Sequence, residues 1–337
     1  MSKYYYLVAG LPNLTFDGFK PPLTILEFKE ELAKHITKAD TRLLEMLQLK
    51  IDAKNLLEQL RNPDYELKDG GRITADELTV LISGIQTEYK CKKEIEEYNK
   101  EAVAYNNALK ADENKYDYFD GFYKKKPKQK IKRFPKPFKN KNKRLPTFFE
   151  KFTRLYFTLI EVGHEINIPW EDRLLSMFYE YAMKHSNSFL SAWFELNLNI
   201  NNIYTALTCF KYNFDRDIYI VGNTETSNKL RTSTARDFDL GESLTYLTSL
   251  LGIAEDPDIL QREWRTDQLK WEWLDKQVFP KVFDIENVIT YQLKVEMQEH
   301  WTTLNKVEGE KTFRQIVEPL KKGGTHILEE FKRNNKK

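Results

Sequence analysis

The chain has 337 residues, 41% of them hydrophobic and 13% aromatic, which is enough to bury a core and excludes a disordered chain. Its 53 basic and 51 acidic side chains nearly balance, and its two cysteines form no pattern typical of a disulfide framework or a zinc site. No secretory leader is evident and no apolar run approaches the roughly 20 residues that span a bilayer, so we expect a cytoplasmic protein.

Helical patterns dominate the chain after its first dozen residues. The segment Tyr4–Leu11 is rich in aromatic residues and is closed by a Gly and a Pro, which favours a short β-strand or an extended arm. From Pro22 onward apolar residues recur at helical spacing. The stretch from Thr74 to Glu77 has the spacing of a helix capping box, and Tyr89–Lys110 is typical of a long solvated helix. The sequence therefore predicts an all-α, multi-helix protein with a short N-terminal strand or extended arm.

One phrase occurs three times along the chain. Each copy begins with Asp or Asn, has Asn three residues later, and continues with apolar residues at helical spacing. Asp and Asn are good N-cap residues, and the Asn stands where a capping-box partner would sit, so each copy predicts a helix start. Chance similarity among helix starts is the alternative. The candidate caps are Asp52, Asn55, Asn199, Asn202, Asp284 and Asn287.

The segment 124–144 differs in composition from the rest of the chain. It holds about a dozen Lys and Arg, no acid and three prolines, which predicts an extended, mobile insertion. Three interpretations are open. The segment is a solvated loop, or it contacts an anionic membrane surface, or it binds single-stranded nucleic acid through its charges and through Phe134 and Phe138. The candidate contacts are Lys124, Lys125, Lys126, Lys128, Lys130, Lys132 and Arg133.

These patterns divide the chain into four parts. We expect an N-terminal helical unit over residues 1–121, a basic Lys/Pro-rich flexible insertion over 122–146, a central helical unit over 147–260 and a C-terminal helical unit over 261–337. The three helical units are expected to be similar to one another, because each contains one copy of the repeated phrase.

The sequence offers no recognisable catalytic constellation. It has neither of the glycine-rich motifs that cradle nucleotide phosphates and no histidine spacing suited to zinc. The polar stretch from Arg231 to Asp237 is interpreted as a connection packed through Phe238, with an anion-binding site that includes Ser233 as the alternative. We therefore predict a protein that is not an enzyme and has no catalytic residue, cofactor, metal or small-molecule substrate. An enzyme with an unrecognised site near Arg231–Asp237 is a further hypothesis.

Three stretches carry a family likeness. They are Tyr4–Pro12 (YYYLVAGLP), Trp193–Ile203 (WFELNLNINNI) and Ala235–Phe238 (ARDF). They resemble a bacterial family of unknown function that is encoded beside V/A-type ATPase genes, and the likeness covers most of the chain outside the Lys-rich insertion.

The repeated phrase is separately similar to one in the C subunit of V/A-type ATPases, which is the d subunit in eukaryotes. That phrase has the form acidic-Leu-x-Asn-Ile-x-x-x-Leu, with a basic residue soon after. Here it maps to Asn199, Ile200, Asn202, Ile203, Leu207 and Lys211. Asn199 replaces the acid, and Phe210 stands where a basic residue is common.

The resemblance implies a funnel of three similar all-helical units and a non-catalytic role. The C subunit sits on the cytoplasmic mouth of the membrane rotor ring and receives the central shaft. The resemblance thus implies a central-stalk subunit that couples the soluble motor to ion transport, peripheral at the inner membrane, with the other ATPase subunits as partners and an anionic membrane surface as a further contact. Under this hypothesis we expect no nucleic-acid partner. The alternative hypothesis is a nucleic-acid-binding protein that acts through residues 124–144.

Overall fold

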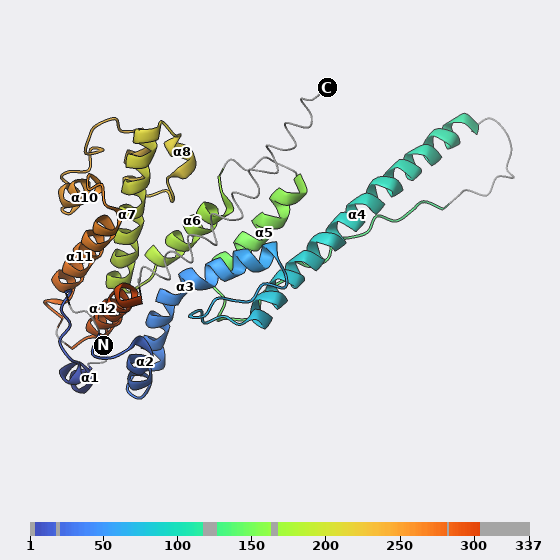
Figure 1. Cartoon of the computed structure of the whole chain (residues 1–337). Helices are drawn as coiled ribbons and strands as arrows, with labels where there is room; N and C mark the ends of the chain where they lie inside the picture. The colour runs from blue at the N-terminus through green and yellow to red at the C-terminus, as the bar shows by residue number, and fades with distance from the viewer. Residues whose placement is uncertain (1–3, 18–20, 117–126, 163–167, 282, 304–337) are drawn as a thin grey trace, which may run out of the picture. The chain divides into compact units, whose positions relative to one another are not determined.

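The structure is a computed structural model that describes residues 4–17, 21–116, 127–162, 168–281 and 283–303 (Figure 1). Every regular element within these ranges is a helix, which confirms the all-α class. None of the described helices is long and apolar enough to cross a membrane. The helices are α1 (Tyr5–Gly10), α2 (Ile25–Ala33), α3 (Lys38–Arg61), α4 (Ala75–Tyr116), α5 (Thr147–Val162), α6 (Trp170–Met183), α7 (Ser188–Tyr212), α8 (Arg216–Tyr219), α9 (Glu225–Thr232), α10 (Leu247–Ala254), α11 (Ile259–Val278) and α12 (Ile285–Thr303).

The chain folds into two compact units. Unit 1 comprises Met1–Leu44 and Gly241–Lys337, and unit 2 comprises Glu45–Leu240. Unit 1 is therefore built from both ends of the chain, whereas the three helical units that the sequence predicted follow one another along it. Contacts between α2 and α12, which are far apart in sequence, join the two ends. Local sequence patterns carry no information about such a contact.

Helix α12 forms the centre of unit 1, where it packs against α2 and α11. The rings of Phe28 on α2 and Tyr291 on α12 lie 5.0 Å apart. The ring of Phe16, which precedes α2, lies 5.0 Å from that of Trp264 and 5.5 Å from that of Trp271, both on α11. Aromatic contacts of this kind bury large areas, so they fix the N-terminal segment against the C-terminal helices of the unit.

The predicted N-terminal strand is wrong, because the described part of this segment forms the short helix α1. The backbone N–H of Val8 donates to the carbonyl of Tyr4 at 2.9 Å, which closes a helical turn. The backbone N–H of Tyr4 donates to the carbonyl of Phe283 at 2.7 Å, and its hydroxyl donates to Asp40. A strand needs a neighbouring sheet edge for its backbone groups. No strand occurs in the described ranges, so local helical hydrogen bonds replace that pairing.

Helix α7 forms the centre of unit 2, where it packs against α6, α8 and α9. Its apolar residues are buried on several faces, as expected of a helix inside a core. Helix α5 packs against both α4 and α6, with aromatic contacts such as the edge-to-face pair of Phe148 on α5 and Phe178 on α6 at 6.3 Å. Helix α5 begins at Thr147, the residue at which the sequence predicted the central helical unit to begin.

Candidate functional site

The first two copies of the repeated phrase lie inside helices and not at their starts. Asp52 is an interior residue of α3, Asn199 is an interior residue of α7, and both side chains are buried. The cap of α7 is instead Asn187, which accepts a hydrogen bond from the backbone N–H of Leu190 at 3.0 Å. The predicted N-cap role of Asp52 and Asn199 is therefore wrong, because both residues lie within continuous helices.

What these two copies share is an Asn that holds the backbone of one residue in a later loop. Asn55 accepts a hydrogen bond from the backbone N–H of Lys68 at 3.0 Å and donates one to its carbonyl at 3.1 Å. Asn202 does the same with Val221, at 3.0 Å and 2.7 Å. We call this arrangement the Asn clasp. Both Asn side chains are buried, and each clasp satisfies their donor and acceptor together with two backbone groups of the loop.

A similar series of residues follows each clasp. Gly70 and Gly222 come soon after the clasped residues and have φ of 92° and 79°, a conformation that Gly adopts without strain. A Thr then caps the next helix by accepting a hydrogen bond from the backbone N–H three residues on, at 3.4 Å for Thr74 and 3.0 Å for Thr224. The capping box predicted from Thr74 and Glu77 is confirmed. The shared series indicates a structural repeat of helix, clasped loop and capped helix within unit 2.

The third copy lacks the clasp. Asp284 directly precedes α12, at the helix start that the sequence predicted. Asn287 donates a hydrogen bond to the carbonyl of Lys281, which lies before the helix and not in a later loop. The pattern that the sequence repeats three times therefore forms a clasp twice, because the third copy begins a helix whereas the other two lie within one.

The position three residues before the clasp Asn differs between the two copies. Asp52 Oδ1 accepts hydrogen bonds from the backbone N–H groups of Arg72 at 2.9 Å and Ile73 at 3.1 Å. Burial raises the pKa of Asp52, and these two hydrogen bonds oppose the rise only in part. A Cβ added at Gly71 would lie 2.4 Å from Asp52 Oδ1, so the loop can approach this closely only with Gly. In the second copy the neutral and buried Asn199 takes this place.

The basic segment after α4 is held against that helix. We call residues 127–144 the strap, and Figure 1 shows it as an extended chain running alongside α4. Asn99 accepts a hydrogen bond from the backbone N–H of Lys132 at 2.8 Å and donates to its carbonyl at 2.9 Å. Asn106 does the same with Gln129, at 2.9 Å in both directions. Two further Asn clasps thus hold a segment that the sequence predicted to be a mobile insertion.

The spacing of these two clasps matches the geometry of the two elements. Asn99 and Asn106 are separated by two turns of α4, which advance about 10 Å. Gln129 and Lys132 are separated by three residues, which advance about 9 Å in a polyproline II conformation. The prediction of mobility rested on the like charges and the prolines of the segment. It did not take into account the Asn side chains of α4 that bind the strap. The seven-residue spacing of two Asn on the predicted helix is the sequence feature that points to them.

A carboxylate anchors the other end of the strap. Glu88 accepts hydrogen bonds from the backbone N–H of Phe138 at 2.7 Å and from Arg154 at 2.9 Å, and it pairs with Lys92 at 2.6 Å. Burial alone would raise the pKa of Glu88, but these hydrogen bonds outweigh it and lower the pKa to about 2. A Cβ added at Gly84 would lie 2.3 Å from the ring of Phe138, so the glycine makes room for that ring on α4.

The described basic side chains of the strap face solvent. Lys132 Nζ lies 4.0 Å from the centre of the Tyr98 ring, a cation–π contact on α4. Lys124, Lys125 and Lys126 lie outside the described residues. The remaining predicted contacts are exposed, and they are Lys128, Lys130, Lys132 and Arg133.

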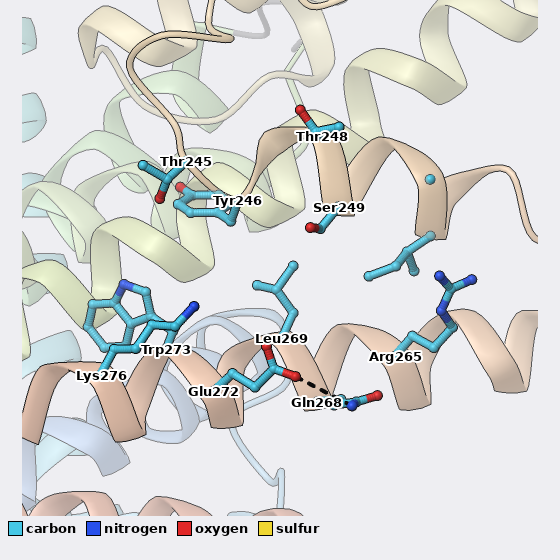
Figure 2. Close-up of a pocket in the computed structure, with 12 residues that line it drawn as sticks. Thr245, Tyr246, Thr248, Ser249, Arg265, Gln268, Leu269, Glu272, Trp273 and Lys276 are labelled. Atoms are coloured by element: carbon cyan, nitrogen blue, oxygen red, sulfur yellow. Dashed lines mark hydrogen bonds between the residues drawn. The ribbon is translucent and has the colours of Figure 1, made fainter. Parts of the chain in front are cut away.

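A shallow groove of about 440 Å³ lies between α10 and α11 in unit 1. Figure 2 shows Ser249 of α10 and Leu269 of α11 pointing into the space between the two helices, and Gln268 donating a hydrogen bond to Glu272 at 3.4 Å. No His or Cys is among the described residues that line it. The lining residues are Thr245, Tyr246, Thr248, Ser249, Gly252, Ile253, Arg265, Gln268, Leu269, Glu272, Trp273 and Lys276.

The polar stretch near Arg231 is used to hold loops together. Arg231 donates hydrogen bonds to two backbone carbonyls of the preceding loop, at 2.7 Å and 2.6 Å. Arg216 likewise donates to two carbonyls, at 2.9 Å and 2.6 Å. Both arginines line a cavity of about 480 Å³, whereas Arg236 and Asp237 do not. The arrangement therefore favours the structural interpretation of this stretch over an anion-binding or catalytic site.

Four exposed aromatic residues gather where α7 ends. We call Phe210, Tyr212, Phe214 and Tyr219 the aromatic cluster; they are between 41% and 71% exposed. The ring of Phe214 lies 6.0 Å from each of the rings of Tyr212 and Tyr219. Contiguous exposed aromatic surface of this kind is typical of a protein–protein contact.

Within the described residues, no group of three or more His, Cys, Asp or Glu side chains is placed to hold a metal ion. Comparison with protein families gives one match, to the family described as protein of unknown function DUF2764, over residues 1–132 and 105–324. Neither the curated proteins nor the solved structures contain a match to this chain.

Proposed function

We propose that this chain, which belongs to the DUF2764 family of proteins of unknown function, is a non-catalytic coupling subunit of a V/A-type rotary ATPase. In this role it is the counterpart of the C subunit, the d subunit of eukaryotes, and it joins the central shaft of the soluble motor to the membrane rotor ring. It serves ion transport mechanically, is held at the inner membrane through the complex, and performs no chemistry of its own.

The observation that carries the proposal is the structural repeat in unit 2. The phrase that resembles the C subunit surrounds Asn202, and its earlier copy surrounds Asn55. Both Asn residues form the same buried clasp between a long helix and the loop that precedes the next helix. The phrase therefore supports a construction made of repeated rigid helical units, as torque transmission requires, and its polar residues are engaged in structure.

The aromatic cluster supplies a contact surface for such a role. Phe210 and Phe214 are 71% and 54% exposed at the end of the clasped helix α7. Aromatic side chains contribute disproportionately to binding when a partner covers them, because they bury large areas with little loss of conformational freedom. The proposal assigns this cluster to the interface with another ATPase subunit.

Affinity purification of the tagged full chain from native membranes tests the proposal. We expect the rotor-ring and central-shaft subunits of the ATPase to co-purify, as identified by mass spectrometry. If the ATPase is expressed and none of its subunits co-purifies, the coupling role is wrong.

A pair of variants tests the assigned surface. Phe210→Ser with Phe214→Ser should reduce recovery of the partner subunits by at least about tenfold, since hot-spot aromatics contribute 2 kcal/mol or more each. The matched control is Ile259→Ser with Leu260→Ser at the start of α11, which removes two apolar side chains that are 65% and 54% exposed. Equal losses from both double variants would show that the cluster has no special part in assembly.

A further inference from the structure

We propose that the strap, supported by α4, is a docking edge for the surface of an anionic phospholipid bilayer. Four features of the strap support this proposal: its charge, its exposed apolar side chains, its extended form and the clasps that hold it to α4. The inference stands independently of the proposed coupling function, because it concerns the binding of the purified chain to lipid alone.

The charge of the strap is of one sign and is not neutralised locally. Residues 127–144 include basic side chains and no acidic one, and all of the basic residues are exposed. Among the described residues, Arg144 is the only one of them with an ion-pair partner, Glu77 at 3.3 Å. An anionic lipid surface attracts each such cation that reaches it, and the contributions add along the segment. The basic residues are Lys128, Lys130, Lys132, Arg133, Lys136, Lys139, Lys141, Lys143 and Arg144.

Two apolar side chains stand exposed between these cations. Ile131 is 61% exposed and Phe134 is 53% exposed. They are three residues apart, which is the spacing of one polyproline II turn and also the spacing of Gln129 and Lys132, the two residues that α4 clasps. A row of cations with apolar side chains between them matches a bilayer interface, where the apolar groups enter the acyl boundary and the cations meet phosphate and carboxylate head groups.

The form of the strap favours a bilayer over a nucleic acid. Single-stranded nucleic acids bind in grooves where several aromatic rings stack on successive bases. The described strap presents one exposed aromatic ring, that of Phe134, and none of its residues lines the cavities of about 440 and 480 Å³ found elsewhere. An extended, exposed edge can lie along a flat surface, which is what a membrane offers.

Helix α4 holds the edge in register. The clasps of Asn99 and Asn106 fix the backbone of the strap at Lys132 and Gln129, and Ala102 between them is fully buried. The charges are therefore aligned before binding, so little conformational entropy is lost when the strap meets the surface.

Vesicle sedimentation with the purified full chain tests the inference. We expect binding to vesicles of phosphatidylcholine with phosphatidylserine and much weaker binding to phosphatidylcholine alone. Raising NaCl from about 0.1 M to about 1 M shortens the screening length from about 10 Å to about 3 Å and should release most of the protein. Absence of binding, or equal binding to both kinds of vesicle, would overturn the proposal.

Charge-neutralising variants locate the contact. Lys130→Gln, Arg133→Gln and Lys136→Gln together should weaken binding to the anionic vesicles on the order of 100-fold. The control removes three exposed lysines elsewhere through Lys54→Gln, Lys184→Gln and Lys276→Gln, and it should leave binding nearly unchanged. If both triple variants lose binding equally, net charge alone is responsible and the strap is no dedicated edge.

An apolar variant and a nucleic-acid probe complete the test. Ile131→Ser with Phe134→Ser should weaken vesicle binding about tenfold while the salt dependence remains. Fluorescence anisotropy with single-stranded polyuridylate measures the competing ligand. Strap-dependent binding of this RNA without binding to anionic vesicles would replace the membrane proposal by a nucleic-acid site.

Discussion

The two buried Asn clasps of unit 2 solve the same problem with loops of different length. Asn55 holds a residue 13 positions later, whereas Asn202 holds a residue 19 positions later. In each case a side-chain amide, which has a donor and an acceptor side by side, binds the N–H and C=O of a single residue. The comparison indicates that the same clasp can hold loops of different length.

The difference between the clasps lies three residues earlier in each helix. In the first, Asp52 receives two backbone N–H groups beside Gly71. In the second, the corresponding residue is Asn199, and its loop turns at Gly222. A buried carboxylate is costly unless it accepts hydrogen bonds, so the charged version occurs where two backbone N–H groups meet it.

The largest effect is expected from removing a clasp amide. Asn202→Ala should lower the free energy of unfolding by about 3–4 kcal/mol and Asn55→Ala by about 2 kcal/mol, because Val221 is more buried than Lys68 and its backbone groups are left without water. Urea denaturation measures both. The control is Asn106→Ala, whose clasp on the strap is exposed to solvent and should cost no more than about 1 kcal/mol. Equal losses at all three sites would show that the stability contributed by a clasp does not depend on its burial.

A charged anchor should differ from the neutral clasps in its dependence on pH. The pKa of Glu88 is lowered from 4.5 to about 2 in the folded chain. Its contribution to the free energy of unfolding is therefore complete above the unfolded pKa and disappears as pH falls from about 4.5 to about 2. That depression corresponds to roughly 3 kcal/mol of stability at neutral pH. Urea denaturation across this pH range should show a loss that Glu88→Gln reduces, while the part due to other carboxylates with lowered pKa, such as Glu77 and Glu171, remains. The exposed control Glu225→Gln should leave the pH profile as it is.

The close approach of loop and helix in the first clasp predicts an intermediate effect. Gly71→Ala brings a Cβ within 2.4 Å of Asp52 Oδ1 and should destabilise the protein by about 2 kcal/mol. Gly252→Ala on α10 is the matched control, since nothing lies within 4 Å of its added Cβ, and it should stabilise by about 0.5–1 kcal/mol. A neutral result for Gly71→Ala in thermal unfolding would mean that the loop moves away without cost.

The smallest effect is expected from making the two clasps alike. Asp52→Asn should change the free energy of unfolding at neutral pH by less than about 1 kcal/mol, because its oxygen still accepts two backbone N–H groups and the burial of a charge is removed. Because the pKa of Asp52 is raised in the folded chain, the free energy of unfolding of the wild type falls as pH rises from the unfolded pKa of 3.8 through the folded pKa. The variant should lack this pH dependence. A loss as large as that of Asn202→Ala would show that the negative charge itself is required.

Contacts within one helical turn could be predicted from the sequence, whereas contacts between distant segments could not. The capping box of Thr74 and Glu77 was predictable, because both partners lie within one helical turn. The repeated Asn was also visible, although its role was not, since its partners lie in a later loop. Asn99 and Asn106 were missed because their partners, Lys132 and Gln129, lie 33 and 23 residues away in a segment whose composition suggested mobility.

By itself the sequence determined that the protein is helical and where several helices begin, because periodicity and capping act within a few residues. It also marked the Asn positions at which the structural repeat of unit 2 is built. Only the tertiary structure decided that Tyr5–Gly10 is a helix, that Asp52 and Asn199 lie inside helices, and that the strap is bound to α4. The strap and Asp52 in particular depend on hydrogen bonds between distant residues, and these exist only once the chain has brought the partners together.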